Sequence, residues 1–537
     1  MKLKQLIYIP LAVALIAAVG TGCKKTDFNI NRNQNDPTDS SVTYDVVLPA
    51  ALHATGTIVA NNWGTIENWM GYWARSGTYA PNVIEETYQI TTGFGNGVWN
   101  SCYDNNYDYN IVELKAHAAG AGFYEGIAKI MKAHNFAILV DVYGNVPYSQ
   151  ALKGSANPTP SYDNGLAIYQ SLLRQIDTGI ALIKGAAVST TNPNKNIATN
   201  DIMFAGDKTL WAKFGNTLKL RLLIHAYAVS AINKPAEIAI INAEGDGYLG
   251  AGQDAQVNPG YKADKPNPFF NNYKSDVTGA QTANNVYYRA NEWAIKYLEW
   301  NGDPRENRLY EAGLNGLVGV KYGLPPTTAN SSDKLAGIGP GIYKSNTASQ
   351  AILTASESLF LQAEAAQRGW ISGSPASLLN SAIVESMRYL GVPNYATAAA
   401  NYINGNAGYP DVDINAGPLA PGGPSGGLFT ILTQKWYAMD GTDPLETWTD
   451  YRRVPYTEVA TKLITTGANA PNDHFVYGDG GGFTPPGPPI SVAPQNTSTK
   501  IPVRYLYPQT EYNYNAGNVG AQGTIDPFTS RIFWDLN

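Results

Sequence analysis

Apolar residues recur every three or four positions through much of the chain, which is the spacing of helices with one buried face. Residues 123–144 carry one such stripe, which closes at Gly144, and residues 166–185 and 209–229 carry two more. We expect these stripes to pack into a core, with the following members: Ile127, Ile130, Met131, His134 and Ile138; Ile168, Leu172, Ile176 and Ile180; Trp211, Phe214, Leu218 and Leu222.

A pair of stripes at residues 353–370 and 374–392 has the signals of two helices joined by a turn. Gly373 ends the connection, Ser374 is suited to cap the second helix, and Pro375 fits its first position. No 34-residue repeat can be read, yet helix pairs with short turns keep recurring. The pattern predicts a mainly α-helical fold with tetratricopeptide-like hairpins.

The N-terminus has the pattern of an export signal. Lys2 and Lys4 precede an apolar run that ends in Gly20, Thr21 and Gly22, and the run is shorter than the roughly 20 residues that span a bilayer. Cys23 follows at once. We predict a signal peptide over residues 1–22. Cys23 is either the first residue after cleavage or an unpaired cysteine without a special role.

The rest of the chain divides by composition. Residues 23–46 are polar and Asn-rich, which predicts an extended tether, and residues 47–537 form the body. Gly, Pro and Asn crowd the stretches at about 243–343, 404–426 and 477–498. Long loops of this kind in compact proteins tend to carry function.

Charge and cysteine usage exclude some classes of protein. The net charge of −6 argues against nucleic acid as a partner, because phosphate binding requires a basic face. The chain has two cysteines, so a lipidated Cys23 would leave Cys102 without a disulfide mate. Stability must therefore come from packing.

Motifs for catalysis, metals and cofactors are weak. The G-x-S-x-G match at residues 423–427 has no preceding strand, the five histidines lack metal spacing, and residues 411–422 depart from a calcium loop. A glycosidase needs two carboxylates about 5 to 9 Å apart in space, and the candidates for such a pair are Glu85, Glu86, Glu357 and Glu364. We expect no catalytic residue, no metal and no cofactor.

One segment resembles a known family closely. Residues 431–455, ILTQKWYAMDGTDPLETWTDYRRVP, are similar to the signature of the SusD/RagB outer-membrane nutrient-binding lipoproteins, with Val454 where the family often has Thr and a longer stretch before Trp448. Further blocks match in order: YGNVPYSQAL, PSYDNGLAIYQSLLRQID, GDKTLWAKFGNTLKLRL, DPRENRLY, TASESLFLQAEAAQRGW, IPVRYLYPQTEYNYN and RIFWDLN. The resemblance covers nearly the whole chain.

The resemblance implies a fold and a role. Family members have tetratricopeptide-like helical bodies with inserted loops on a ligand face, and they lie as lids over a TonB-dependent (SusC-like) barrel that takes up oligosaccharides or, in some branches, peptides. Cys23 resembles the lipidated cysteine that anchors such proteins to the outer membrane at the cell surface, with Gly20 in place of the usual Leu. The alternative function is a lipid-anchored glycoside hydrolase.

The residues of the signature are predicted to be structural. Arginines that fork onto carboxylates and stack on rings suit an internal cluster rather than ligand contact. The predicted members are Gln434, Lys435, Glu446, Trp448, Asp450, Arg452 and Arg453.

Ligand contacts are predicted from aromatic content instead. Sugars need aromatic platforms beside amides and carboxylates, and the chain has 11 Trp and 35 Tyr. Two segments combine these residue types, at residues 61–89 and 261–273. The candidate ligand contacts are Trp73, Arg75, Tyr79, Tyr88, Tyr261 and Tyr273. For Trp73 a place in the core is the alternative, because it follows Ile66 and Trp69 at helical spacing.

Overall fold

The computed structural model describes residues 42–416, 427–454 and 489–536. The predicted signal peptide, Cys23 and nearly all of the tether lie outside the described residues, as do parts of the loops predicted at 404–426 and 477–498. The body begins with helix α2 at Tyr44. No helix among the described residues combines the length and the apolar character that a membrane crossing requires.

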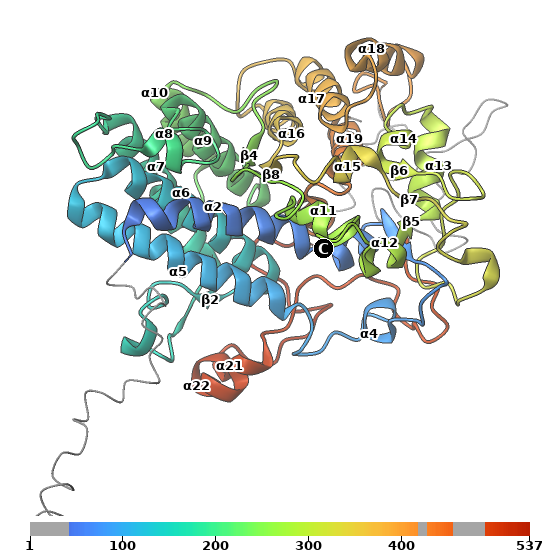
Figure 1. Ribbon diagram of the computed structural model, residues 1–537, viewed down its shortest axis with the longest axis horizontal. Coiled ribbons are helices and arrows are strands. Elements are labelled where there is room, and N and C mark those ends of the chain that lie inside the picture. Colours follow the sequence, from blue (N-terminus) through green and yellow to red (C-terminus); the bar gives the residue numbers. More distant parts are fainter. Residues whose placement is uncertain (1–41, 417–426, 455–488, 537) are drawn as a thin grey trace, which may run out of the picture. The chain divides into compact units, whose positions relative to one another are not determined.

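Long antiparallel helices make up the first part of the body (Figure 1). α5 and α6 form a hairpin whose turn is Gly120 and Ala121, α7 packs on the other side of α6, and α2 packs on α5. The helices of this part are α2 (Tyr44–Asn61), α5 (Asn96–Ala119), α6 (Gly122–Tyr143), α7 (Gly165–Gly185), α8 (Ile197–Asn200), α9 (Lys208–His225) and α10 (Lys234–Glu244).

Glycine permits the tight contact between α6 and α7. A Cβ atom at Gly126 would lie 2.5 Å from the carbonyl oxygen of Gly179, closer than any real side chain allows. Only hydrogen side chains let the two backbones approach this closely. This contact buries the predicted stripes of both helices.

A second hairpin, α16 (Ala355–Gln367) and α17 (Pro375–Leu390), confirms the predicted helix pair. The Ser374 side chain accepts a hydrogen bond from the Ser377 N–H at 3.3 Å, and Pro375 is the first helical residue. α18 (Tyr395–Gly405) packs on α17, and α19 (Gly427–Met439) packs on α16 and leads into α20 (Pro444–Arg453). The tetratricopeptide-like helical architecture predicted from the sequence is therefore present.

Short elements fill the stretches between the long helices. The segment predicted as loop-rich at 243–343 contains small helices, of which α13 is the longest, and short strands. The remaining helices are α3 (Gly64–Trp69), α4 (Val83–Glu86), η1 (Gly154–Ala156), α11 (Pro268–Tyr273), α12 (Ala283–Tyr287), α13 (Glu292–Asn301), α14 (Glu306–Leu309), η2 (Thr328–Asn330), α15 (Pro340–Tyr343), α21 (Gln509–Tyr514) and α22 (Ala516–Gly520).

The strands form antiparallel pairs rather than a larger sheet. β1 (Trp73–Arg75) pairs with β5 (Tyr288–Ala290), and β4 (Ala255–Val257) pairs with β8 (Gln350–Leu353). β2 (Val146–Pro147) pairs with β3 (Tyr162–Asp163), and β6 (Tyr310–Glu311) pairs with β7 (Gly337–Ile338). These pairs fasten segments that are distant in sequence, such as residues 73–75 and 288–290.

The predicted core stripes are buried, which confirms them. α6 ends at Tyr143 with Gly144 as its cap, and all thirteen side chains assigned to the three stripes are buried. His134 is among them, and its Nδ1 lies 3.1 Å from Asn135 Oδ1. A satisfied core histidine is the usual outcome for such a residue on a helix face.

A group of buried charges ties four helices together, and we call it the charge network. Its members come from α9, α16, α19, α20 and the turn before α20: Arg221, His225, Glu357, Glu364, Lys435, Asp443, Glu446, Asp450 and Arg453. The Arg453 guanidinium binds both oxygens of Glu364 at 2.7 and 2.6 Å and also binds Asp450 Oδ1. Such forked charge-assisted bonds are among the strongest in proteins.

The middle of the charge network contains alternating positive and negative groups. Lys435 Nζ lies 3.0 Å from Glu446 and 3.2 Å from Asp450, and His225 Nε2 lies 2.8 Å from Glu446. Burial alone would lower the pKa of His225, but the carboxylates of Glu446 and Asp141 outweigh it and raise that pKa to about 9. His225 is therefore a cation at neutral pH.

Three carboxylates of the charge network come close enough to resemble a metal site. One oxygen each from Glu357, Asp443 and Glu446 lies within 4.8 Å of the others. The Arg221 guanidinium binds Glu357 and lies 3.3 Å from Asp443 and 3.5 Å from Glu446. A side chain thus supplies the positive charge that this cluster needs.

Arg452 and Trp448 form a second buried contact beside the charge network. The guanidinium carbon of Arg452 lies 3.6 Å from the Trp448 ring centroid and 4.7 Å from that of Trp534. Arg452 Nη1 donates to the carbonyl oxygens of Asp141 and Val503. The C-terminal segment is thereby joined to α6 and α20.

Gln434, the remaining signature residue, is also engaged inside the protein. It donates from Nε2 to Tyr402 Oη and to the Asp411 carbonyl.

We expect Arg452→Ala and Trp448→Ala each to lower the free energy of unfolding by about 3 to 5 kcal/mol. The first removes the donor that two buried carbonyl oxygens share, and the second leaves a cavity under the guanidinium. Chemical denaturation monitored by circular dichroism measures the change, and Arg531→Ala, at an exposed arginine, is the control. Unchanged unfolding midpoints together with lost ligand affinity would contradict the structural role.

Candidate functional site

The structure places the six predicted ligand contacts in two different environments. Tyr79 is partly exposed. The other five are each 5% exposed or less: Trp73, Arg75, Tyr88, Tyr261 and Tyr273. Their rings and polar groups contact protein, so the described structure leaves them little surface for a ligand, and ligand contact at these positions stays an untested prediction.

Trp73 and Tyr273, predicted in separate segments, come together inside the body. The Trp73 ring centroid lies 5.3 Å from Tyr273, 5.3 Å from Tyr288 and 6.4 Å from Phe269. Trp73 Nε1 donates to Asp440 Oδ1 at 3.0 Å. These aromatic rings, which come from β1, β5 and α11, therefore pack together as one cluster.

Tyr88 and Tyr261 are also held by protein contacts. The Tyr88 hydroxyl accepts the Ser491 N–H at 2.9 Å. The ring of Tyr261 lies 5.7 Å from that of His53, and burial raises the pKa of both tyrosines. The sequence shows that aromatic residues are present in these segments, but it does not show whether the fold buries their rings.

Arg75 positions the loop that carries Tyr79. Its guanidinium forms a buried ion pair with Glu86 and donates to the Tyr79 carbonyl oxygen at 2.8 Å and to that of Leu324 at 3.0 Å. The loop between β1 and α4 is thus fixed from beneath at its backbone. Tyr79 therefore lies on a loop whose backbone is held in place by hydrogen bonds.

A partly exposed aromatic pair lies on this loop, and we call it the Tyr79 face: Tyr79, Asn82 and Tyr287. The two rings lie 5.4 Å apart at 58°, and the Tyr79 hydroxyl donates to the Ala283 carbonyl at 3.3 Å. Asn82 is exposed, caps α4 by accepting the Glu85 N–H, and has its amide near Tyr287. The next residues, Val83 and Ile84, are exposed apolar side chains.

Tyr287 was not among the residues predicted from sequence. It ends α12, directly before β5, and faces Tyr79 across more than two hundred intervening residues because β1 and β5 are paired. Two consecutive tyrosines at 287 and 288 are its only sequence signal. One of them is turned toward Tyr79 and the other toward Trp73.

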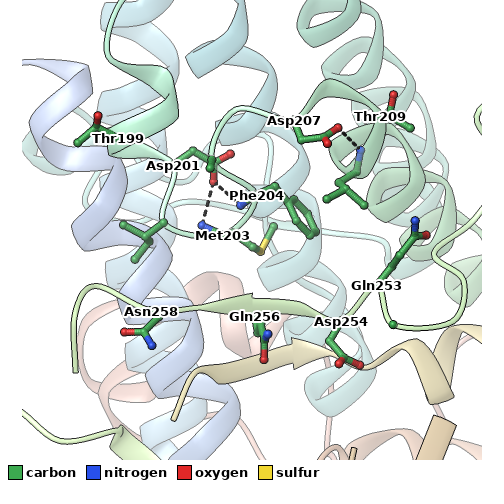
Figure 2. Close-up of a pocket in the computed structure, with 14 residues that line it drawn as sticks. Thr199, Asp201, Met203, Phe204, Asp207, Thr209, Gln253, Asp254, Gln256 and Asn258 are labelled. Atoms are coloured by element: carbon green, nitrogen blue, oxygen red, sulfur yellow. Dashed lines mark hydrogen bonds between the residues drawn. The ribbon is translucent and has the colours of Figure 1, made fainter. Parts of the chain in front are cut away.

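A separate open cleft of about 700 Å³ lies between residues 199–210 and the strand β4 (Figure 2). Figure 2 shows Asp201, Met203 and Phe204 on one side and Gln253, Asp254, Gln256 and Asn258 on the other. The size suits a small-molecule ligand. Its polar groups, however, are largely engaged.

The carboxylates of the Figure 2 cleft serve the fold. Asp201 accepts the N–H groups of Met203 and Phe204 and the Trp211 Nε1–H, and Asp207 caps α9. Asp254 is paired with Arg388. Phe204, the aromatic residue among the lining side chains, is buried. The cleft therefore lacks the exposed ring that a sugar would stack on.

The four carboxylates considered for hydrolysis are all buried and occupied. Glu85 accepts from Thr65 at 3.0 Å, and Glu86 is paired with Arg75. Glu357 and Glu364 belong to the charge network with Arg221 and Arg453. Each has a protein partner that neutralises or binds it, and this arrangement suits structural roles.

Comparisons with known proteins agree with the helical fold. A SusD/RagB family protein from Bacteroides thetaiotaomicron is 20% identical, with a TM-score of 0.67 over 92% of this chain and 99% of that one. A chitin-binding SusD homologue from Flavobacterium johnsoniae is 20% identical, with a TM-score of 0.68 over 92% and 99%. Another chitin-binding protein is 23% identical, with a TM-score of 0.67 over 91% and 100%.

The structural comparisons show the fold, whereas the sequence comparison identifies the family. No protein with a curated description matches the chain. The family model described as starch-binding and associating with the outer membrane matches residues 35–476. Because this match covers most of the chain, the protein belongs to the SusD-like family, as the ordered sequence blocks predicted.

Proposed function

We propose that this protein is a non-catalytic receptor that binds oligosaccharides at the Tyr79 face and passes them to a TonB-dependent outer-membrane transporter. Membership of a family described as starch-binding supports the ligand class, as do structural neighbours described as chitin-binding. Peptides are the other ligand class that the sequence resemblance allows. Transfer to a SusC-like barrel rests on that resemblance alone.

The partly exposed Tyr79–Tyr287 pair beside Asn82 is the observation that carries the proposal. A sugar ring presents an apolar C–H face and a rim of hydroxyl groups, so it binds best to an aromatic surface flanked by an amide. Val83 and Ile84 extend the apolar surface along α4. The Tyr79 face therefore provides both parts of a saccharide site.

The buried ion pair beneath the Tyr79 face favours affinity. Arg75 is bound to Glu86 and to the Tyr79 backbone, so the loop is already ordered before a ligand arrives. A preformed site avoids the entropy cost of ordering a loop on binding. Arg75, predicted as a ligand contact, supports the site from below in this account.

Attachment to the outer membrane is part of the same proposal. The family description names association with the outer membrane. Cys23, which lies outside the described residues, supplies a thiol for lipidation, and the polar residues that follow it give a tether. More than one acyl chain is needed for stable anchoring, as in bacterial lipoproteins.

Tyr79→Ala should weaken binding of long oligosaccharides by about 1 to 3 kcal/mol, the range of aromatic anchors. Calorimetry with maltoheptaose and chitohexaose measures it, and Tyr514→Ala, at an exposed tyrosine of α21, is the matched control. The recovered sugars should contain no new reducing ends. Unchanged affinity in a folded Tyr79→Ala variant would move the site elsewhere, and peptide binding without glycan binding would refute the ligand class.

Cys23→Ser should release the protein from the membrane fraction without changing its melting temperature, since the cysteine precedes the packed body that begins at Tyr44. Fractionation of cells that express each form, followed by a high-salt wash, measures the distribution. Cys102→Ser, at a buried cysteine, is the control and should stay in the membrane fraction. A Cys23→Ser protein that remains with washed membranes would disprove lipid anchoring.

A further inference from the structure

A second hollow lies between the end of α13 and the helix α18, and we call it the α13–α18 cleft. Its volume is about 670 Å³. This volume falls within the usual range for small-molecule sites. The cleft shares no lining residue with the Tyr79 face or with the cleft of Figure 2.

Aromatic and amide side chains both line the α13–α18 cleft. The lining residues that matter here are Trp300, Asn301, Asn401, Tyr402, Asn406 and Tyr409. Tyr409 is 37% exposed and Asn401 is exposed at the rim. Rings for stacking and amides for hydroxyl groups are the two requirements of a saccharide site.

The floor of the cleft is held rigidly by hydrogen bonds. The Tyr402 hydroxyl accepts from Gln434 Nε2 at 3.0 Å, and Asn301 Nδ2 donates to the Tyr437 hydroxyl at 2.9 Å. Asn406 Nδ2 donates to the backbone carbonyls of Asn301 and Tyr402 at 3.1 and 2.8 Å. These bonds fix the orientation of the floor before any ligand binds.

One acceptor in this floor lacks a donor. Asn301 is 6% exposed, and its Oδ1 has no hydrogen-bond partner. A buried acceptor left unsatisfied typically costs about 1 to 3 kcal/mol, so native structures rarely keep one without a reason. This oxygen is itself buried, so it lies beneath the surface of the cleft and is not a ligand contact in the described structure.

The charge of the lining narrows the ligand class. Glu299 is the one ionisable acid among the lining residues, and none of them is Lys or Arg. An anionic ligand would find no countercharge there, whereas the amides suit neutral hydroxyl and acetamido groups. The Figure 2 cleft has a similar volume but carries three aspartates and a buried ring.

We propose that the α13–α18 cleft is a second saccharide-binding site, which takes a short segment of a neutral oligosaccharide with a ring stacked on Tyr409 and a hydroxyl group bound to the exposed Asn401 amide. This inference rests on the proposed function of the protein as a glycan receptor. Two sites on one receptor retain a long glycan better than either alone, if one chain reaches both.

The test is calorimetry of maltoheptaose and chitohexaose with four proteins: wild type, Tyr79→Ala, Tyr409→Ala and Tyr395→Ala. Tyr395 is the matched control, because it begins α18 and is 38% exposed, close to the 37% of Tyr409, but does not line the cleft. We expect two sites in the wild type, with Tyr409→Ala weakening one by at least about fivefold. Tyr395→Ala should bind as the wild type does.

Asn401→Ala is a second rim variant, and it decides the question if Tyr409→Ala has a lowered melting temperature. Retained two-site binding in the folded rim variants would overturn the second site, as would loss of all binding in Tyr79→Ala. Binding that survives Tyr79→Ala but is lost in both rim variants supports the cleft and removes the Tyr79 face from the proposed function. Absence of binding by every protein to both sugars would overturn both proposals.

Discussion

The forked ion pair between Arg453 and two carboxylates is the contact on which the rest of the structure depends. Arg453 joins Glu364 of α16 to Asp450 of α20, and Lys435 of α19 then links Asp450 to Glu446. Buried charges lose their hydration, so such a network is tolerated only when every member has its partners. The four helices must therefore assemble in one register, and Arg452 adds the C-terminal segment to that register.

This requirement separates the scaffold from the ligand-binding surface. The polar groups of the charge network bind one another, and its residues are buried. The Tyr79 face and the α13–α18 cleft instead use side chains on short elements and turns, and hydrogen bonds from the Arg75 and Asn406 side chains hold the backbone at each site. Substitutions in these loops can therefore change ligand specificity without disturbing the charges that hold the helices together.

The sequence predicted the scaffold better than the binding surface. Helical periodicity identified the buried stripes, and Ser374 and Pro375 marked a helix start because capping is a local property. In the predicted ligand segments, helical spacing indicated a core position for Trp73 alone and gave no information on the exposure of the tyrosines. Trp73 and Tyr273 are covered by each other, and Tyr287 meets Tyr79 through the β1–β5 pairing, so these outcomes depend on contacts between distant segments. The α13–α18 cleft likewise joins residues about one hundred positions apart.

A crystal structure of the protein with a bound malto- or chito-oligosaccharide tests the central claim most directly, because it locates the sugar and shows the scaffold at once. The account predicts a sugar ring stacked on Tyr79 or Tyr287, with the Arg453–Glu364 and Lys435–Glu446 contacts unchanged. An oligosaccharide that binds elsewhere and leaves the Tyr79 face empty, or a charge network that opens on binding, would contradict it.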